Sequence, residues 1–407
     1  MEYQIYHLPD GLRVIHAPVK SDAAYCGFVV NAGTRDENRD EYGMAHFVEH
    51  CLFKGTVKRN ARHILNRMET VGGELNAYTT KEETIIYSVF LEEHIGRAME
   101  LLSDLIFNSV FPQKEIEKEI EVVLDEINSY EDSPSELIFD DFENMLFEGH
   151  PLGHNILGEP EVLKLFTNEK TTRFFGRNYS SRNMVFFSMG KTDFKKIVRL
   201  SEKYLTASHY SNEVLKPSFS LPETERKQAR LNKNTNQTHV LIGNRSYGYR
   251  HPKKRVLLLL NNILGGPGMN SRLNISLREK SGLVYNVESS LTSFADTGVF
   301  SVYFGTDKKN TDRCINLVLK ELKRLKTEKL TGNALHSAKR QLSGQIGIAR
   351  EQRENTALNM GKSLLRFDKY ESLPEIYRTI ESVTAEDILE TADEIFDENR
   401  LSSLIYE

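Results

Sequence analysis

The sequence predicts an α+β protein made of two structurally similar α/β-sandwich domains, each a mostly antiparallel sheet packed with helices. Its 407 residues exceed the size, about 250–300 residues, at which a single hydrophobic core stops growing. Strand-like and helix-like runs alternate in the first half, and the second half repeats their order. Little residue identity survives between the halves, so the predicted duplication depends on this order alone.

The first half begins with a strand–turn–strand pattern over residues 3–15, and Ala24–Ala32 is typical of a buried strand. Gly43–Lys54 and Ala61–Thr70 are predicted helices, and the second stops at Gly72-Gly73. The later elements are strands at Glu74–Thr80, Thr84–Leu91 and Asn183–Gly190, and helices at Glu93–Asn108, Gln113–Tyr130 and Thr192–Leu205. Thr192 or Asp193 is expected to cap the last of these helices.

The stretch Thr206–Lys227 mixes Ser, Pro and charged residues without periodicity, which predicts a linker. We therefore expect an N-terminal domain at 1–208, a linker at 209–226 and a C-terminal domain at 227–407. The predicted elements of the second half are helices at Arg255–Leu264 and Asn270–Lys280, and strands before Gly243 and at Val284–Ser293, Gly298–Gly305 and Leu401–Tyr406. Long helices are expected between the last two strands.

The composition is that of a globular protein, with 39% hydrophobic and 27% charged residues. No apolar run approaches the roughly 18 residues of a transmembrane helix, and the first residues show no signal-peptide pattern. A net charge of −5 without a basic stripe argues against nucleic-acid binding. Cys26, Cys51 and Cys314 are too few and too scattered for a disulfide framework. We expect a cytoplasmic protein that binds neither nucleic acid nor membrane.

The segment His46–His50 (HFVEH) carries the sharpest chemical signal. Positions i and i+4 lie on one face of a helix, so His46 and His50 can bind one metal ion together. Glu49 lies beside that face, where a general base for hydrolysis belongs. A catalytic zinc ion usually takes three protein ligands, so a third must come from elsewhere.

The acidic helix Glu115–Ile127 is the best source of that ligand. Glu119 and Glu126 are two helical turns apart and share a face beside an apolar stripe. Both features also have ordinary explanations. A short His/Glu motif can arise by chance, and an acidic helix is usually a solvated face. The surrounding residues therefore decide between a metal site and these ordinary explanations.

Three neighbouring runs, Gly33–Glu37 (GTRDE), Gly43–His50 (GMAHFVEH) and Phe53–Thr56 (FKGT), resemble the signature of the inverzincin zinc peptidases. This superfamily includes pitrilysin, insulin-degrading enzyme and the mitochondrial processing peptidase, and the chain resembles its small two-domain bacterial type. The run Asn76–Thr84 matches the family pattern NAxTxxExT. The family's distal zinc ligand lies about 76 residues after the second histidine, and here 126 − 50 = 76.

The second half continues the resemblance through Leu264–Leu273 and Leu277–Tyr285. It implies that Arg278 and Tyr285 bind the substrate backbone and the developing oxyanion. Without the resemblance, Arg278 would be an ordinary surface residue and Tyr285 a core strand residue.

By this resemblance His46, His50 and Glu126 would hold one zinc ion per chain, and Glu49 would deprotonate the attacking water. Glu119 would support catalysis by orienting a histidine, and its alternative role is a surface ion pair. Asn76 and Ala77 would bind a peptide that joins the strand Glu74–Thr80 by β-augmentation. An ordinary edge strand with Asn at a bulge is the alternative.

The resemblance implies a zinc-dependent metalloendopeptidase that cuts short or unfolded peptides inside an enclosed chamber. In the family two such two-domain halves enclose the substrate, so we expect a homodimer in which Arg278 and Tyr285 act in trans. The alternative is a noncatalytic or zinc-bearing subunit of a hetero-oligomeric processing peptidase. Cys51 is expected in the core, and His150 and His154 in loops.

Overall fold

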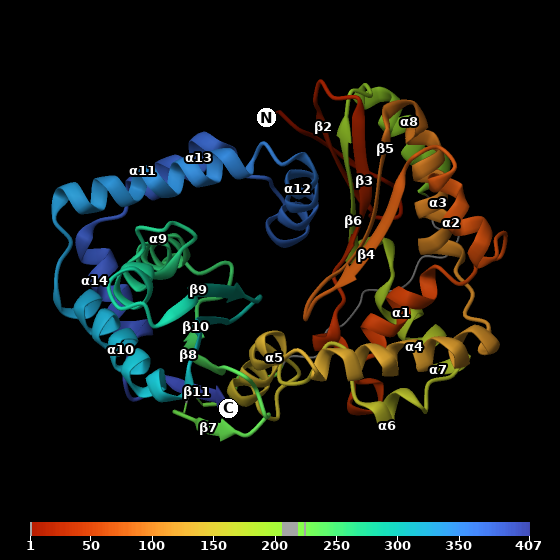
Figure 1. Ribbon diagram of the computed structural model, residues 1–407. Helices are drawn as coiled ribbons and strands as arrows, with labels where there is room; N and C mark the ends of the chain where they lie inside the picture. Colours follow the sequence, from red (N-terminus) through yellow and green to blue (C-terminus); the bar gives the residue numbers. More distant parts are fainter. Residues whose placement is uncertain (1, 206–218, 224) are drawn as a thin grey trace. The chain divides into compact units, whose positions relative to one another are not determined.

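The computed structural model describes residues 2–205, 219–223 and 225–407. Its contacts form two compact units (Figure 1). Unit 1 contains Met1–Ile127, His154–Phe219 and Ala349–Ser372, and unit 2 contains Asn128–Gly153, Ser220–Ile348 and Leu373–Glu407. The expected linker at 209–226 lies largely outside the described residues. The units are not contiguous in sequence, so the boundaries at 208 and 227 stay a prediction.

The sheet of unit 1 has six strands, and all neighbours are antiparallel except β2 and β6. Across the sheet they are β1 (Gln4–His7), β2 (Arg13–Pro18), β6 (Met184–Gly190), β3 (Ala23–Val30), β5 (Thr84–Leu91) and β4 (Glu74–Thr79). Strand β4 therefore forms one edge of the sheet.

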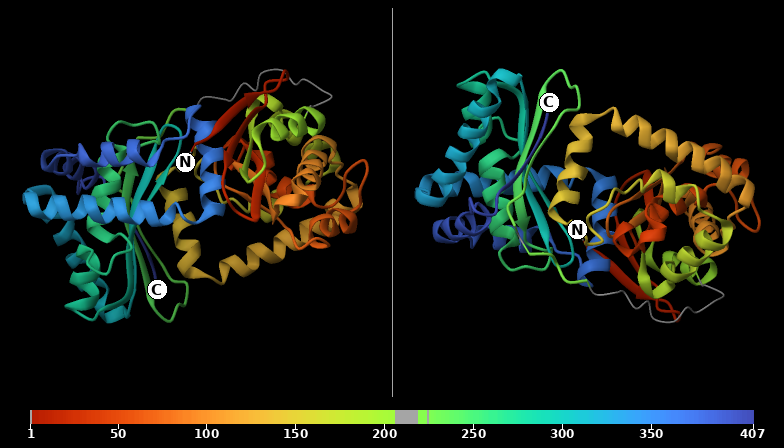
Figure 2. Two further views of the ribbon diagram at one scale, coloured as in Figure 1. Left: turned by 90° about the horizontal axis from the view of Figure 1, so that it is seen from above. Right: turned by 90° about the horizontal axis from the view of Figure 1, so that it is seen from below.

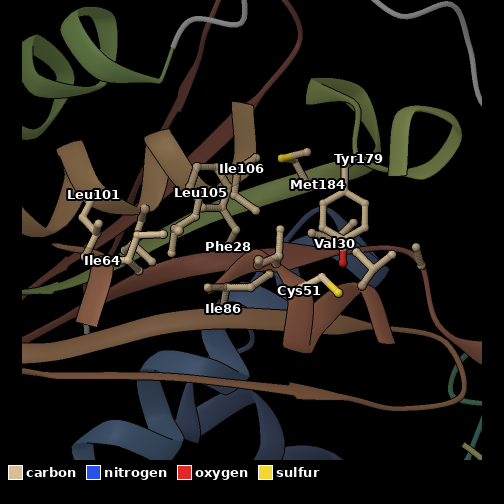
Figure 3. Close-up of a cluster of buried hydrophobic side chains, with 14 of the residues drawn as sticks. Phe28, Val30, Cys51, Ile64, Ile86, Leu101, Leu105, Ile106, Tyr179 and Met184 are labelled. Carbon is tan, nitrogen blue, oxygen red and sulfur yellow. The ribbon is translucent and has the colours of Figure 1, made fainter. Parts of the chain in front are cut away.

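One face of this sheet is covered by helices from the first half of the chain, over a core that includes Phe28, Ile86 and Leu105 (Figure 3). These helices are α1 (Met44–Leu52), α2 (Ala61–Glu69), α3 (Ile95–Asn108), α4 (Gln113–Glu131), α6 (Pro160–Leu163), α7 (Asn168–Asn178) and α8 (Phe194–Tyr204). Cys51 is buried in this core, as expected. Asp193 accepts a hydrogen bond from the Lys195 N–H, which confirms it as a helix cap.

The opposite face of the sheet is covered by α12 (Arg353–Phe367), which comes from the second half of the chain (Figures 1 and 2). Its Ala357, Met360 and Leu364 pack with Val29 and Phe187 in a separate apolar cluster. Both faces of this six-stranded sheet are therefore buried, which explains why β6 is buried at every residue.

Unit 2 contains a five-stranded sheet in the order β7 (Gln228–Leu231), β11 (Ser402–Tyr406), β8 (Thr238–Ser246), β10 (Gly298–Thr306) and β9 (Val284–Ser293). Only β7 and β11 run parallel. Its helices are α9 (Lys254–Gly265), α10 (Thr311–Thr327), α11 (Gly332–Ala349), α13 (Leu373–Glu381) and α14 (Ala385–Ile395). Helices such as α9 and α14 pack on one face of this sheet. Helix α5 (Pro134–Leu146), from the first half of the chain, packs on the other face.

The α+β prediction is confirmed, because each unit is a mostly antiparallel sheet packed with helices. The helix expected at Asn270–Lys280 differs in detail: Asn274–Glu279 forms a π-helical segment, a conformation often found at functional sites. No helix among the described residues is long and apolar enough to cross a membrane.

Candidate metal centre

A buried carboxylate fixes the start of helix α1. The backbone N–H groups of Gly43 and Ala45 donate to Glu37 at 2.9 and 2.7 Å, so its side chain satisfies two otherwise unpaired donors of the helix. Gly43 has φ +95°, a conformation that glycine adopts without strain. His154 Nε2 donates to the same carboxylate at 2.9 Å. Residues far apart in sequence therefore set the position of α1.

Helix α1 and helix α4 bring three potential metal ligands together. The Nε2 atoms of His46 and His50 lie 3.8 and 3.6 Å from Oε2 of Glu126. One ligand atom from each residue lies within 4.8 Å of the others. The structure thus brings these three predicted residues together, close enough to hold a single metal ion.

Glu119 lies one layer behind this group. Its Oε1 accepts a hydrogen bond from His50 Nδ1 at 2.9 Å, and its Oε2 pairs with Lys54 Nζ at 2.6 Å. A proton on Nδ1 leaves the Nε2 lone pair of His50 facing Glu126, which is the tautomer that a metal needs. The side chain of Glu119 is only 5% exposed, so it is not a solvated surface carboxylate.

The protonation state of His46 suits metal binding. Burial, and then the neighbouring His50, lower the pKa of His46 to about 3, so its imidazole is neutral at pH 7. Neutral imidazole and ionised carboxylate are the forms that bind zinc. His46 Nδ1 is buried and has no hydrogen-bond partner among the described residues. Two histidines and one carboxylate fit zinc, because they leave a fourth position for water.

Glu49 lies between the metal group and strand β4. Thr79 Oγ1 donates to its Oε2 at 2.7 Å and holds the carboxylate in place. Burial raises the pKa of Glu49, and the Thr79 hydrogen bond opposes this rise. A carboxyl group with a raised pKa, close enough to His50 and Glu126 to feel their charges, is suited to accept a proton and pass it on.

Asn76 and Ala77 lie on β4, the strand that carries Thr79. Among the described strands β4 pairs only with β5, so its other side offers backbone groups to an added strand. Both residues are half-buried and lie in regular register with β5, opposite Tyr87 and Ile86, so the bulge at Asn76 that belonged to the alternative explanation is absent.

Arg278 and Tyr285 belong to unit 2. The Arg278 guanidinium lies over the Tyr285 ring, with its central carbon 5.6 Å from the ring centroid. Tyr285 is 84% exposed, which excludes the core position that its strand context suggested as an alternative. Arg278 lies on the π-helical segment Asn274–Glu279, so the two side chains form one polar, exposed pair.

Sequence reasoning missed Thr79, Lys54, Glu37 and His154 as parts of this centre. Glu37, Lys54 and Thr79 lie inside the runs that carry the family resemblance, so the resemblance could have drawn attention to them. His154 lies outside helices and strands, as expected for a loop residue, yet it is buried. Its role depends on a contact that bridges 117 positions of sequence.

Comparison with known proteins identifies the family. Residues 13–160 match the model of the insulinase family, peptidase family M16, and residues 166–342 match the M16 inactive domain. An uncharacterized zinc protease of Rickettsia bellii is 32% identical over 405 residues, which cover 99% of this chain and 97% of that protein. The chain belongs to peptidase family M16.

A further relative and a solved structure extend the comparison. The β subunit of the mitochondrial-processing peptidase of Saccharomyces cerevisiae is 30% identical, over 94% of this chain and 86% of that protein. The crystal structure of a protease from Helicobacter pylori has a TM-score of 0.94 with 20% identity, and covers 100% of this chain and 99% of that one. The likeness to this crystal structure shows that the chain shares its fold.

Proposed function

We propose that this M16 protein is a zinc-dependent endopeptidase that hydrolyses short or unfolded peptides. The observation that carries the proposal is the convergence of His46, His50 and Glu126, with the Glu49 carboxylate held beside them by Thr79. Family membership and relatives named zinc proteases support it.

In this proposal His46, His50 and Glu126 hold one zinc ion. When bound, zinc supplies Lewis-acid chemistry, which lowers the pKa of a coordinated water and polarises a carbonyl. Glu49 takes a proton from the attacking water and delivers it to the leaving amine. Glu119 keeps His50 in the tautomer that presents Nε2, and Lys54 holds Glu119 in its ionised form.

The peptide substrate joins the free edge of β4 as an additional strand. Main-chain hydrogen bonds beside Asn76 and Ala77 give affinity without demanding a particular sequence. Only an extended chain can make these bonds, so a folded protein is a poor substrate. Because Thr79 follows Asn76 and Ala77 on the same strand, a peptide bound there passes close to Glu49.

Arg278 and Tyr285 complete the site from a second copy of the chain in a homodimer. The exposure of the two side chains supports this role. The hydroxyl of Tyr285, whose residue is 84% exposed, and the neighbouring Arg278 guanidinium can both donate hydrogen bonds to a bound peptide. Mixing inactive Glu49→Gln chains with inactive Tyr285→Phe chains tests this. About a quarter of wild-type activity returns if the dimers reassort, whereas no recovery contradicts action in trans.

The direct test of peptidase activity is cleavage of an unstructured peptide that carries a fluorophore and a quencher. Purified protein should cleave it, lose activity with a chelator and regain it with stoichiometric zinc. A zinc-loaded wild-type protein that cleaves no peptide contradicts the proposal.

A second candidate is a zinc-bearing or noncatalytic subunit of a hetero-oligomeric processing peptidase. Similarity to a protein named as a β subunit favours it, as does the match of residues 166–342 to a domain described as inactive. Activity that appears only after a second, different chain is added supports this candidate and excludes the homodimer.

A further inference from the structure

Strand β4 presents different surroundings on its two faces. Leu75 and Ala77 pack toward the core that α1 and α3 cover, and Thr79 continues this face to Glu49. Tyr78 lies on the opposite face and packs in the cluster that α12 covers. Side chains of a peptide strand alternate in the same way, so every second one meets the face on the α12 side.

A lysine of α12 reaches this face of the edge strand. Lys362 Nζ lies 5.2 Å from the centroid of the Tyr78 ring and 4.0 Å from Oε2 of Glu83. Its side chain is 23% exposed, and it makes no hydrogen bond to a described residue. Oε1 of Glu83 is paired more closely with Arg366, at 2.5 Å, so Lys362 is the more distant of its two cationic partners. Lys362 is thus a partly desolvated ammonium with a weak ion pair and room for an acceptor.

The charge beside β4 changes sign within two residues. Tyr87 faces Asn76 across the strand pair, and its hydroxyl donates to Glu354 of α12 at 2.8 Å. The carboxylate of Glu354 therefore lies near the strand position of Asn76, whereas the ammonium of Lys362 lies near the strand position of Tyr78. A preference that arises from Lys362 must appear at one peptide position and not over the whole peptide.

We propose that Lys362 is a specificity-determining residue, which selects an acidic side chain at the peptide position that lies beside Tyr78 on the α12 face. This inference rests on the proposed function, because it assumes that a peptide binds along β4. Directly opposed side chains on one face of a strand pair lie about 4.5–5.5 Å apart at Cβ, so a carboxylate beside Tyr78 can reach Lys362. Burial lowers the pKa of Lys362, the charge of Glu83 opposes this fall and the charge of Arg366 adds to it, so a bound carboxylate would stabilise the ammonium further.

The selected position lies near the bond that is cut. Tyr78 is the immediate neighbour of Thr79, whose hydroxyl contacts Glu49. Successive residues of a strand advance about 3.3 Å, so the acidic side chain falls within about two residues of the scissile bond.

Cleavage of a mixed library of unstructured peptides by the zinc-loaded protein, with products identified by mass spectrometry, tests the proposal. Wild type should enrich Asp and Glu at one position within about two residues of the cut, by about 3- to 10-fold over Gln and Asn. Lys362→Gln should abolish this enrichment, and Lys362→Glu should replace it by enrichment of Lys and Arg. Lys196→Gln, on the exposed face of α8, is the matched control and should keep the wild-type pattern.

If both Lys362 variants keep the wild-type enrichment of Asp and Glu, the proposed role of Lys362 is wrong, whereas the proposed peptidase activity is unaffected. If wild type cleaves nothing, the proposed function fails separately, and binding then decides the inference. Fluorescence anisotropy would compare a peptide containing Glu with its Gln counterpart on wild type and on Lys362→Gln. A tighter Kd for the Glu peptide that vanishes in the variant supports the role of Lys362, and equal Kd values on wild type contradict it.

Discussion

His50 Nδ1 donates to Oε1 of Glu119 at 2.9 Å, while Nε2 of the same ring lies 3.6 Å from Oε2 of Glu126. One imidazole therefore connects two carboxylates of α4 that are seven residues apart, and each carboxylate has a different task. Glu126 is exposed enough to meet a metal ion, with 43% of its side chain accessible, whereas Glu119 is buried and paired with Lys54. In the proposed zinc site, Glu119 therefore orients the His50 ring so that Nε2 faces the metal.

Glu119→Gln should weaken zinc binding by about 10- to 100-fold, because the His50 ring loses the anion that orients it and raises its basicity. Competition with a fluorescent zinc chelator measures the change. Glu121→Gln on the exposed side of α4 is the control and should bind zinc as wild type does. Equal affinities for both variants would mean that Glu119 is only an ion-pair partner of Lys54.

Glu126→Ala should reduce bound zinc to well below one ion per chain, since two imidazoles alone leave the site without its third ligand. Metal analysis after dialysis against a weak chelator checks this. Asp125→Ala changes a neighbouring exposed carboxylate and should retain zinc. A Glu126→Ala protein that keeps stoichiometric zinc would remove Glu126 from the ligand set.

Thr79→Val should shift the acid limb of the activity profile to higher pH. Thr79 donates to the Glu49 carboxylate, which favours the ionised form and lowers its pKa, so removal of the hydroxyl raises that pKa. Glu49 accepts a proton only when ionised, and kcat/KM on the acid limb of the profile should therefore fall by about 10-fold relative to wild type. Profiles of kcat/KM against pH measure this, with Thr172→Val on α7 as the control. A profile that drops equally at every pH would point to misplacement of β4 instead.

His16 should make unit 1 less stable in mild acid. It is buried between Ser188 and Thr192, with its Nδ1 2.8 Å from the Ser188 hydroxyl and its Nε2 2.9 Å from the Thr192 carbonyl. Burial lowers its pKa below the unfolded value of about 6.5, so below that pH the unfolded chain binds a proton that the folded chain refuses. Stability is thus fully present above about pH 6.5 and decreases as the pH falls, by at most about 1.4 kcal/mol per pH unit.

Urea unfolding of the chelator-treated protein between pH 8 and pH 5 measures this effect. His16→Gln removes the titrating group, so the free energy of unfolding of wild type should fall more steeply with decreasing pH than that of the variant. Parallel curves would show that His16 is not the group responsible.

The sequence was sufficient to predict that His46, His50 and Glu126 come together beside Glu49, because His46, Glu49 and His50 share one helix and Glu126 stands at a characteristic spacing. It was also sufficient for most strands and helices, since their periodicity is local. Contacts such as Thr79 with Glu49 depend on which strand lies beside α1, and no local pattern encodes that. Likewise, the amphipathic pattern of α12 shows that one face is buried, but not that it packs on the sheet of unit 1.

The π-helical segment Asn274–Glu279 illustrates the same limit. Its apolar spacing is compatible with an ordinary α-helix, and that is what periodicity predicts. Leu273 and Leu277, at its start and within it, are both buried in the core of unit 2, and local periodicity does not reveal how they fit there. Arg278 lies within this segment, so the exact direction of a proposed substrate-binding residue could not be derived from the sequence.

The central claim is that Glu49 performs proton transfer at a metal ion held by its neighbours. The most direct measurement is zinc content together with cleavage of a quenched fluorescent peptide, for wild type and Glu49→Gln side by side. The account predicts about one zinc ion per chain in both proteins and cleavage by wild type only, with a loss of at least about 1,000-fold in the variant. Full activity of Glu49→Gln, or no zinc in wild type, would contradict it.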